Sequence, residues 1–430
     1  MMSLDLALAV TFAVTLISGV PVAFSLALTS LVFLLIMGSV PLHLIPQRIF
    51  TGMDSFPVMA VPFFILAGDL MNAAGITEKI VRFASVLVGH IRGGLAHVNV
   101  VASMFFAGVS GSAVADAAAL GSILIPAMEE DGYDKTFAAS VTAAAAVIGP
   151  IIPPSIPVVI YALSGSISIG GLFLAGVLPG VLIGLGLMMV SYVLARRHNY
   201  GHKHPLATLK EFWDSLTGAI VPLFMPLIIM GGILGGIFTP TEASCVAVAY
   251  AIVIGLFVLK TIKLRDLPAI VYRSMLITST ILMVMGCANI FSWILGTQQI
   301  PQAVGAALTS FTKNPYVFLL LVNLFLLVVG CFLEGIAAIV LITPILIPVA
   351  QALGISQLHF GMVVIMNLMI GLITPPLGLC LFVACSVAKV DFTQLIRASY
   401  PFLLVEIVAL FIVTYLPFFT LFIPNLFGFR

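Results

Sequence analysis

Two stretches of this chain, 222 residues apart, decide its fold. The first reads GVSGSAVADAAALGSILIPAM at 108–128, and the second reads GCFLEGIAAIVLITPILIPVA at 330–350. A shift of 222 residues superposes their opening glycines and the two ILIP runs, and the register continues without a gap to Pro179 and Pro401. Within it the Pro-Pro pairs at 153–154 and 375–376 also coincide. The chain is therefore predicted to contain an internal repeat.

The composition places this repeat in a membrane protein. Of the 430 residues, 62% are hydrophobic and 8% are charged, whereas soluble proteins carry about 25% charged residues. The mean hydropathy is +1.26, and apolar runs follow one another from Leu4 to Phe427. We therefore expect an all-α polytopic protein embedded in a lipid bilayer. A net charge of +1 leaves no basic face for nucleic acid, so no nucleic-acid partner is expected.

Apolar runs bounded by glycine, proline or charge predict the spanning helices. They lie at 4–18, 20–37, 56–73, 134–163, 170–195, 217–238, 242–259, 274–296, 358–388 and 399–424. Two longer stretches, 94–130 and 315–351, have small or polar residues in their middles and are predicted to be re-entrant helical hairpins. Non-helical backbone at membrane depth is tolerated only inside protein or beside a cavity. The segments 76–92 and 298–312 are predicted to lie at the interface.

These elements group into four regions. Residues 1–55 form N-terminal scaffold helices, and residues 196–273 form a cytoplasmic loop with connecting scaffold helices. The first repeat is 56–195, with its hairpin at about 94–130 and a broken helix at about 134–163. The second repeat is 274–424, with its hairpin at about 315–351 and a broken helix at about 358–388.

The basic residues favour one orientation. Of the 17 Lys and Arg residues, only Arg48, Lys313 and Arg430 fall outside 76–93, 196–210, 260–273, 389–397 and Lys135. If 196–210 is cytoplasmic, all these segments lie on the same side, as the positive-inside rule favours. The first repeat then enters the membrane from the cytoplasm and the second from the opposite side. Inverted repeats of this kind are the usual architecture of secondary transporters.

Each repeat has two interruptions, a hairpin tip and a helix break. The tips read GVSGS at 108–112 and GCFLEG at 330–335, and the breaks read GPIIPPS at 149–155 and GLITPP at 371–376. Successive prolines free backbone carbonyls from the helix ladder, and a hard cation is a suitable partner for such carbonyls and for hydroxyl oxygens. The half-helix N-termini favour an anion. The interruptions therefore predict a central ion and substrate site.

Acidic residues inside apolar runs are further candidates for this site. They are Asp69, Asp116, Glu242, Glu334 and Glu406, of which Glu406 is expected to contact another helix or another subunit. The predicted substrate contacts are Ser110, Gly111, Ser155, Asp116, Glu334 and Pro375. No H-E-x-x-H, G-x-S-x-G or Walker sequence occurs. The protein is therefore not expected to be an enzyme, and an ion gradient or a partner must drive transport.

Five motifs of this chain, taken together, resemble the large membrane subunit of tripartite ATP-independent periplasmic (TRAP) transporters. They are MDSFPVMAVPFFILAGDLM (53–71), the tip at 108–128, IGPIIPPS (148–155), FTPTEA (238–243) and ITPPLG (373–378). The resemblance, which covers essentially the whole chain, implies a multi-pass protein of the bacterial inner membrane. It implies sodium-coupled import of a carboxylate such as a C4-dicarboxylate, sialic acid or a similar sugar acid. It also implies an elevator mechanism, in which we expect 94–163 and 315–388 to move against a fixed scaffold.

The resemblance also implies partners and two sodium sites. The partners are a periplasmic substrate-binding protein and a small four-helix membrane subunit, expected as a separate chain because the flank of the first repeat begins within the opening fifty residues. The first sodium site would use Ser110, Ser112, Gly149, Ile152 and Pro154. The second would use Gly330, Gly371, Thr374 and Leu377. Two alternatives are a self-sufficient sodium-coupled dicarboxylate carrier and a non-transport membrane component of a larger complex.

Overall fold

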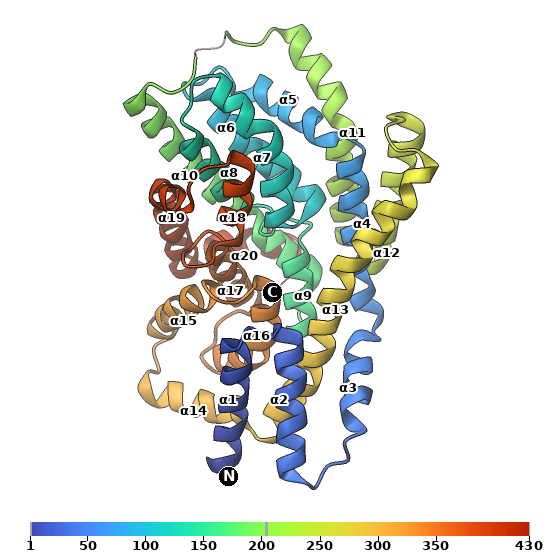
Figure 1. Cartoon of the computed structure of the whole chain (residues 1–430), viewed down its shortest axis with the longest axis vertical. Helices are drawn as coiled ribbons and strands as arrows, with labels where there is room; N and C mark the ends of the chain where they lie inside the picture. Colours follow the sequence, from blue (N-terminus) through green and yellow to red (C-terminus); the bar gives the residue numbers. More distant parts are fainter. Residues whose placement is uncertain (1, 203–204, 430) are drawn as a thin grey trace.

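The computed structural model describes residues 2–202 and 205–429 (Figure 1). Lys203 and Arg430, which enter the charge count above, lie outside these ranges. The described residues form helices and no strand, which confirms the all-α prediction. Seven of these helices are long and apolar enough to cross a membrane by length and composition. The shorter apolar helices include arms of both predicted hairpins and of both broken helices.

Seven helices and three short turns of helix lie outside the hairpins and broken helices, although η1, α4 and most of α13 fall within the predicted bounds of the two repeats. The N-terminal ones are α1 (Met2–Ile17), α2 (Val22–Met37), α3 (Leu44–Met53), η1 (Phe56–Met59) and α4 (Ala60–Ala73). The connecting ones are α11 (Leu209–Leu234), α12 (Pro240–Val253), η2 (Ile254–Val258), η3 (Leu264–Asp266) and α13 (Leu267–Thr297). α12 packs along α4, and α13 packs against α2 and α3. Helix α3 was not predicted, because its ten residues are too few and too polar for a span.

The first repeat contains the predicted hairpin and broken helix. Its helices are α5 (Ile76–Val88), α6 (Gly94–Ser110), α7 (Ala113–Glu130), α8 (Lys135–Ala146), α9 (Ile156–Gly165) and α10 (Ile169–His198). α6 ends where Gly111 takes a left-handed conformation with φ of 60°, which costs a glycine little. α7 begins at once, because the Ser112 side chain caps it by accepting from the amide of Ala115. The hairpin therefore turns within two residues.

The second repeat follows the same plan. Its helices are α14 (Ile300–Phe311), α15 (Pro315–Gly330), α16 (Gly335–Ala352), α17 (Gln357–Gly371), α18 (Leu379–Ala388), α19 (Phe392–Tyr415) and α20 (Phe418–Leu426). Under the 222-residue shift α7 superposes on α16 from end to end. The cap coincides too, since Glu334 lies at the position of Ser112 and accepts from the amide of Ala337 at 3.0 Å. The predicted repeat with two hairpins and two broken helices is thus confirmed.

The single span expected at 399–424 is wrong. The structure divides this stretch into α19 and α20, because Leu416 leaves the helical conformation with φ of −119° and ψ of 82° immediately before Pro417. Proline disfavours the α conformation in the residue before it. The last helix is therefore a short separate element that packs on α10 and α17.

The helices of the two repeats interlock into one packed unit. α18 of the second repeat packs on α7 and α8 of the first, and α9 of the first packs on α16 of the second. α10, α19 and α20 pack on these helices as well, although only the hairpins and broken helices were expected to form the unit. We call α6–α10 with α15–α20 the repeat core, and α1–α4 with α11–α13 the scaffold. In Figure 1, α4, α11 and α12 line one side of the molecule.

The loop after α10 packs against the repeat core and not against the scaffold. The Tyr200 ring stacks on Tyr133, with centroids 5.8 Å apart. His202 Nδ1 lies 2.9 Å from Asp131 Oδ1. Since both partners belong to the turn between α7 and α8, the boundary between the two units falls in the chain after His202.

Single-cysteine labelling tests the inverted arrangement of the hairpins. Glu130 and Gln351 lie near the C-terminal ends of α7 and α16, and both are exposed. Cysteines introduced there in otherwise cysteine-free protein should react with an impermeant maleimide from opposite sides of the membrane. Reaction of both from the same side would contradict the inverted repeat.

Candidate functional site

The first hairpin tip touches the first helix break. A Cβ placed on Gly111 would lie 3.1 Å from the Pro154 carbonyl oxygen and 3.3 Å from Ser155 Cα, so the backbones meet without a side chain between them. Ser155 caps α9, and its hydroxyl donates to the Pro150 carbonyl inside the break. Ser155 is buried at the end of this loop. It therefore shapes the break and does not face open solvent.

A carboxylate lies directly behind the first tip. Asp116, on the first turn of α7, is fully buried, and one of its oxygens accepts from the Ser110 hydroxyl. Its Oδ2 has no hydrogen-bond partner among the described residues. A Cβ on Gly149 would overlap this same oxygen. Ser110, Asp116 and Gly149 therefore converge on one point between the tip and the break.

The oxygens at this point suit a hard monovalent cation. Sodium and similar cations take oxygen ligands from carbonyls, hydroxyls and carboxylates, and an unpaired buried carboxylate carries a large cost without a cation or a proton. The Ile152 side chain points out of the break and packs on Gly180 of α10, so only the backbone of Ile152 faces the inside of the break. Asp116, predicted as a substrate contact, thus lies among the predicted ion ligands.

The second tip and break meet through two glycines. A Cβ on Gly371 would lie 2.5 Å from the Gly330 carbonyl oxygen, so α15 and α17 approach here backbone to backbone. The Thr374 hydroxyl donates to the Ile370 carbonyl at 2.8 Å and keeps a lone pair that can accept or ligate. Leu377 is 43% exposed, and Pro375 is half-buried. Gly330, Gly371 and Thr374 thus lie near one another, with Leu377 at the rim.

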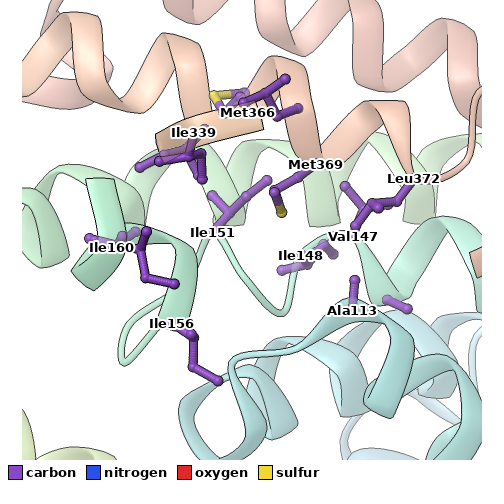
Figure 2. Close-up of a cluster of buried hydrophobic side chains, with 14 of the residues drawn as sticks. Ala113, Val147, Ile148, Ile151, Ile156, Ile160, Ile339, Met366, Met369 and Leu372 are labelled. Atoms are coloured by element: carbon purple, nitrogen blue, oxygen red, sulfur yellow. The ribbon is translucent and has the colours of Figure 1, made fainter. Parts of the chain in front are cut away.

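An apolar cluster joins the two breaks. Figure 2 shows Ile148 and Ile151 of the first break facing Ile339 of α16 and Met369 and Leu372 at the end of α17. All five side chains are at most 7% exposed. Close packing of such side chains stabilises the contact through many van der Waals interactions. The two candidate ion sites therefore lie on either side of one continuous hydrophobic core.

A cavity of about 510 Å³ opens beside the first tip. Ser110, Gly111, Ser112 and Glu334 line it from the repeat core. Of the other predicted substrate contacts, Asp116 lies behind this wall, and neither Ser155 nor Pro375 lines the cavity. Three of the six predicted substrate contacts, Ser110, Gly111 and Glu334, therefore line one cavity, together with Ser112 of the predicted first sodium site.

The scaffold supplies the opposite wall of this cavity. Asp69 and Asn72 of α4 and Arg273 and Thr280 of α13 line it, and Asp69 accepts from the Ser274 hydroxyl at 2.6 Å. Of these residues only Asp69 was singled out from the sequence. Arg273 was counted only as a basic residue of a cytoplasmic segment, although its place inside the helical run was a signal that could have drawn attention to it.

The two other acidic candidates, Glu242 and Glu406, lie outside this cavity. Glu242 forms a capping box with Thr239 at the start of α12, in which its carboxylate accepts from the Thr239 amide at 2.8 Å. Glu406 is fully buried in α19, and neither of its oxygens has a partner among the described residues. Its burial within this chain places its contacts between helices of this chain and not with another subunit.

Comparison with known proteins identifies this arrangement. Residues 9–419 match the family model of the tripartite ATP-independent periplasmic transporter, DctM component. The chain belongs to this family. It is the large membrane subunit of a TRAP transporter and not an enzyme, and it crosses the membrane several times.

Several relatives of this TRAP subunit have names that state a substrate. The sialic acid TRAP transporter large permease protein SiaM of Vibrio cholerae is 44% identical over 96% of each chain. The C4-dicarboxylate TRAP transporter large permease protein DctM of Rhodobacter capsulatus is 38% identical over 96% of this chain and 97% of its own. The isethionate TRAP transporter permease protein DctMQ of Oleidesulfovibrio alaskensis is 40% identical over 94% of this chain and 64% of its own.

A solved structure shares the fold of this TRAP subunit. The YdaH transporter of Alcanivorax borkumensis, whose crystal structure is described as having an unusual topology, superposes with a TM-score of 0.57. The match covers 86% of this chain and 87% of that one at 17% identity. The similarity therefore concerns the fold alone.

Proposed function

We propose that this TRAP subunit couples the inward movement of sodium to the import of a carboxylate across the inner membrane of a bacterium. The convergence of Ser110, Asp116 and Gly149 behind the first tip carries the proposal. A buried carboxylate oxygen without a partner needs a cation or a proton, and in this proposal sodium serves as the cation and also satisfies the neighbouring oxygens. Gly330, Gly371 and Thr374 offer oxygens for a second sodium ion.

The substrate we propose is a small carboxylate, either a C4-dicarboxylate or a sugar acid such as sialic acid. The N-terminal end of α7 lines the cavity at Ser112–Ala115, and the N-terminus of a helix favours an anion. A volume of about 510 Å³ is within the usual range for small-molecule sites. Relatives that carry either kind of acid support this class.

We further propose that the repeat core moves as one unit against the scaffold, in the manner of an elevator. The apolar cluster between the breaks keeps both ion sites together. Separating them would expose unpaired polar groups, at about 2–7 kcal/mol each in an apolar medium. The moving unit then includes α10, α19 and α20. A small membrane subunit and a periplasmic binding protein complete the transporter, and the binding protein delivers the substrate.

Substitution of Thr374 by valine tests the second sodium site. This change keeps the shape of the side chain and removes one oxygen. The half-saturating sodium concentration for uptake should rise at least about fivefold, since losing one such interaction costs about 1–3 kcal/mol. Uptake of labelled sialic acid and succinate is measured in proteoliposomes that hold the transporter with its small subunit and binding protein.

The matched control is Thr217→Val in α11. Thr217 is exposed, and its hydroxyl donates to the Asp214 carbonyl at 2.9 Å, which is the same kind of bond within a helix. The control should keep the wild-type sodium dependence. Wild-type sodium dependence in Thr374→Val would show that this hydroxyl is not a ligand. Uptake by the chain without a binding protein would favour the self-sufficient carrier.

A further inference from the structure

The cavity beside the first tip has walls from two units that the proposed mechanism moves apart. The repeat core contributes Ser110–Ser112 and Glu334, and the scaffold contributes Asp69, Asn72, Arg273 and Thr280. A substrate held between these walls would touch both units in this state. Contacts with the scaffold would be lost once the repeat core moves away. The scaffold residues of this wall can therefore contact the substrate only while the cavity faces one side of the membrane.

Arg273 is the only basic side chain among the described residues that line this cavity. It lies six residues after the start of α13, which places it about 9 Å along the helix. Arg273 therefore lies in the second turn of this 31-residue helix, at the end that follows the basic segment 260–273. The side chain is exposed and has no ion pair within the described parts of the chain. Its guanidinium is therefore available to a ligand.

The two acidic residues that line the cavity each accept a hydrogen bond from a neighbouring group. Asp69 accepts from the Ser274 hydroxyl at 2.6 Å, and Glu334 accepts from the Ala337 amide at 3.0 Å as the cap of α16. Across the cavity lies the N-terminus of α7, the positive end of its helix dipole. An anion between α7 and Arg273 would thus meet positive partial charge on one wall and a full positive charge on the other.

We propose that Arg273 is a carboxylate-binding residue on the scaffold, used only while the cavity faces the cytoplasm. The inference rests on the proposed function above. The basic segment 260–273 leads into α13, so the Arg273 end of the cavity is its cytoplasmic mouth under the positive-inside rule. The planar guanidinium pairs with a carboxylate through two parallel hydrogen bonds. Arg273 therefore sets the affinity for internal substrate and leaves external affinity to the binding protein and the repeat core.

Inhibition of uptake by internal substrate tests this proposal. Proteoliposomes that hold the complete transporter are loaded with increasing unlabelled succinate or sialic acid, and uptake of the same labelled acid is measured under a sodium gradient. Arg273→Gln should raise the internal concentration that halves uptake by about 10- to 100-fold, the loss expected for a charge-assisted contact. The external half-saturating concentration and the sodium dependence should change less than about twofold. Arg273→Lys should restore part of the internal affinity.

The matched control is Arg265→Gln. Arg265 lies eight residues earlier in the same basic segment, its side chain is 77% exposed beside Asp266, and it does not line the cavity. An unchanged internal affinity in Arg273→Gln, or no inhibition of the wild type by internal substrate, would overturn the proposal. Equal losses on both sides of the membrane would also overturn it, since they indicate a structural role. Failure of the wild type to take up either acid with sodium would instead contradict the proposed function.

Discussion

Substituting Gly149 by alanine is expected to abolish sodium-dependent uptake. The added Cβ would overlap Asp116 Oδ2 at the point where the first tip meets the first break. Asp116 is fully buried and bonded to Ser110, so it has little room to retreat. Overpacking of this kind costs about 1–3 kcal/mol or more, and here it would fall on the ion ligands themselves. Uptake in proteoliposomes should drop roughly 100-fold or more.

A glycine of the adjacent hairpin helix α7 provides the control. A Cβ on Gly121 of α7 would lie 3.4 Å from both Ile125 and Thr142, which is an ordinary contact. Gly121→Ala should therefore insert and transport as the wild type does. The wild type and both variants are also compared by the rise in unfolding temperature that added sodium produces. Full uptake by Gly149→Ala, or an unchanged stabilisation by sodium, would show that the first ion site lies elsewhere.

Substituting Gly68 by leucine is expected to stop transport without removing ion binding. Gly68 belongs to α4 of the scaffold, and a Cβ there would lie 3.1 Å from the Val109 carbonyl oxygen and 3.3 Å from Ser110 Cα. The hairpin tip thus passes the scaffold at a point that has no room for a side chain. A branched side chain should obstruct this passage and lower the rate of uptake at least about tenfold.

The control for Gly68 is a glycine on the scaffold that faces open space. A Cβ on Gly218 of α11 meets no atom within 4 Å, so Gly218→Leu should leave uptake near the wild-type rate. Stabilisation of Gly68→Leu by sodium should remain, since the substitution meets only the backbone of Ser110 and leaves Asp116, Gly149 and the second proposed site unchanged. Wild-type uptake by Gly68→Leu would show that the hairpin tip does not slide past Gly68 during transport. Loss of stabilisation by sodium would show that the substitution damages the ion site instead.

Much of the fold could be predicted because local rules act at the interruptions. Gly111 and Ser112 end one helix and begin the next through a left-handed turn and a side-chain cap, and both signals are visible in the sequence. The Pro-Pro pairs mark the breaks in the same way. Helix α3 and the division between α19 and α20 were missed. The first is too short and polar to count as a span, and the second depends on the conformation of a single residue before Pro417.

The candidate site was predicted in part. Ser110, Gly149 and Gly371 lie at the interruptions, and the structure places each against the opposing tip or break. The sequence could not place Asp116 behind the cavity wall instead of on its surface. The sequence also did not indicate that Arg273 and a hairpin tip more than 150 residues away line the same cavity. Such contacts depend on how α4 and α13 pack, which no local pattern encodes.

The sequence by itself determined the membrane class, the repeat, the hairpins and the breaks. Each depends on composition or on glycine and proline, whose effects on the backbone are local and survive in any tertiary context. Only the tertiary structure decided which helices accompany the hairpins, which acid is buried behind the first tip and which basic residue lines the cavity. Those outcomes depend on side chains from distant segments that meet in three dimensions. The burial of Asp116 and the exposure of Arg273 follow from packing, because the same residue types would serve equally well on a solvated surface.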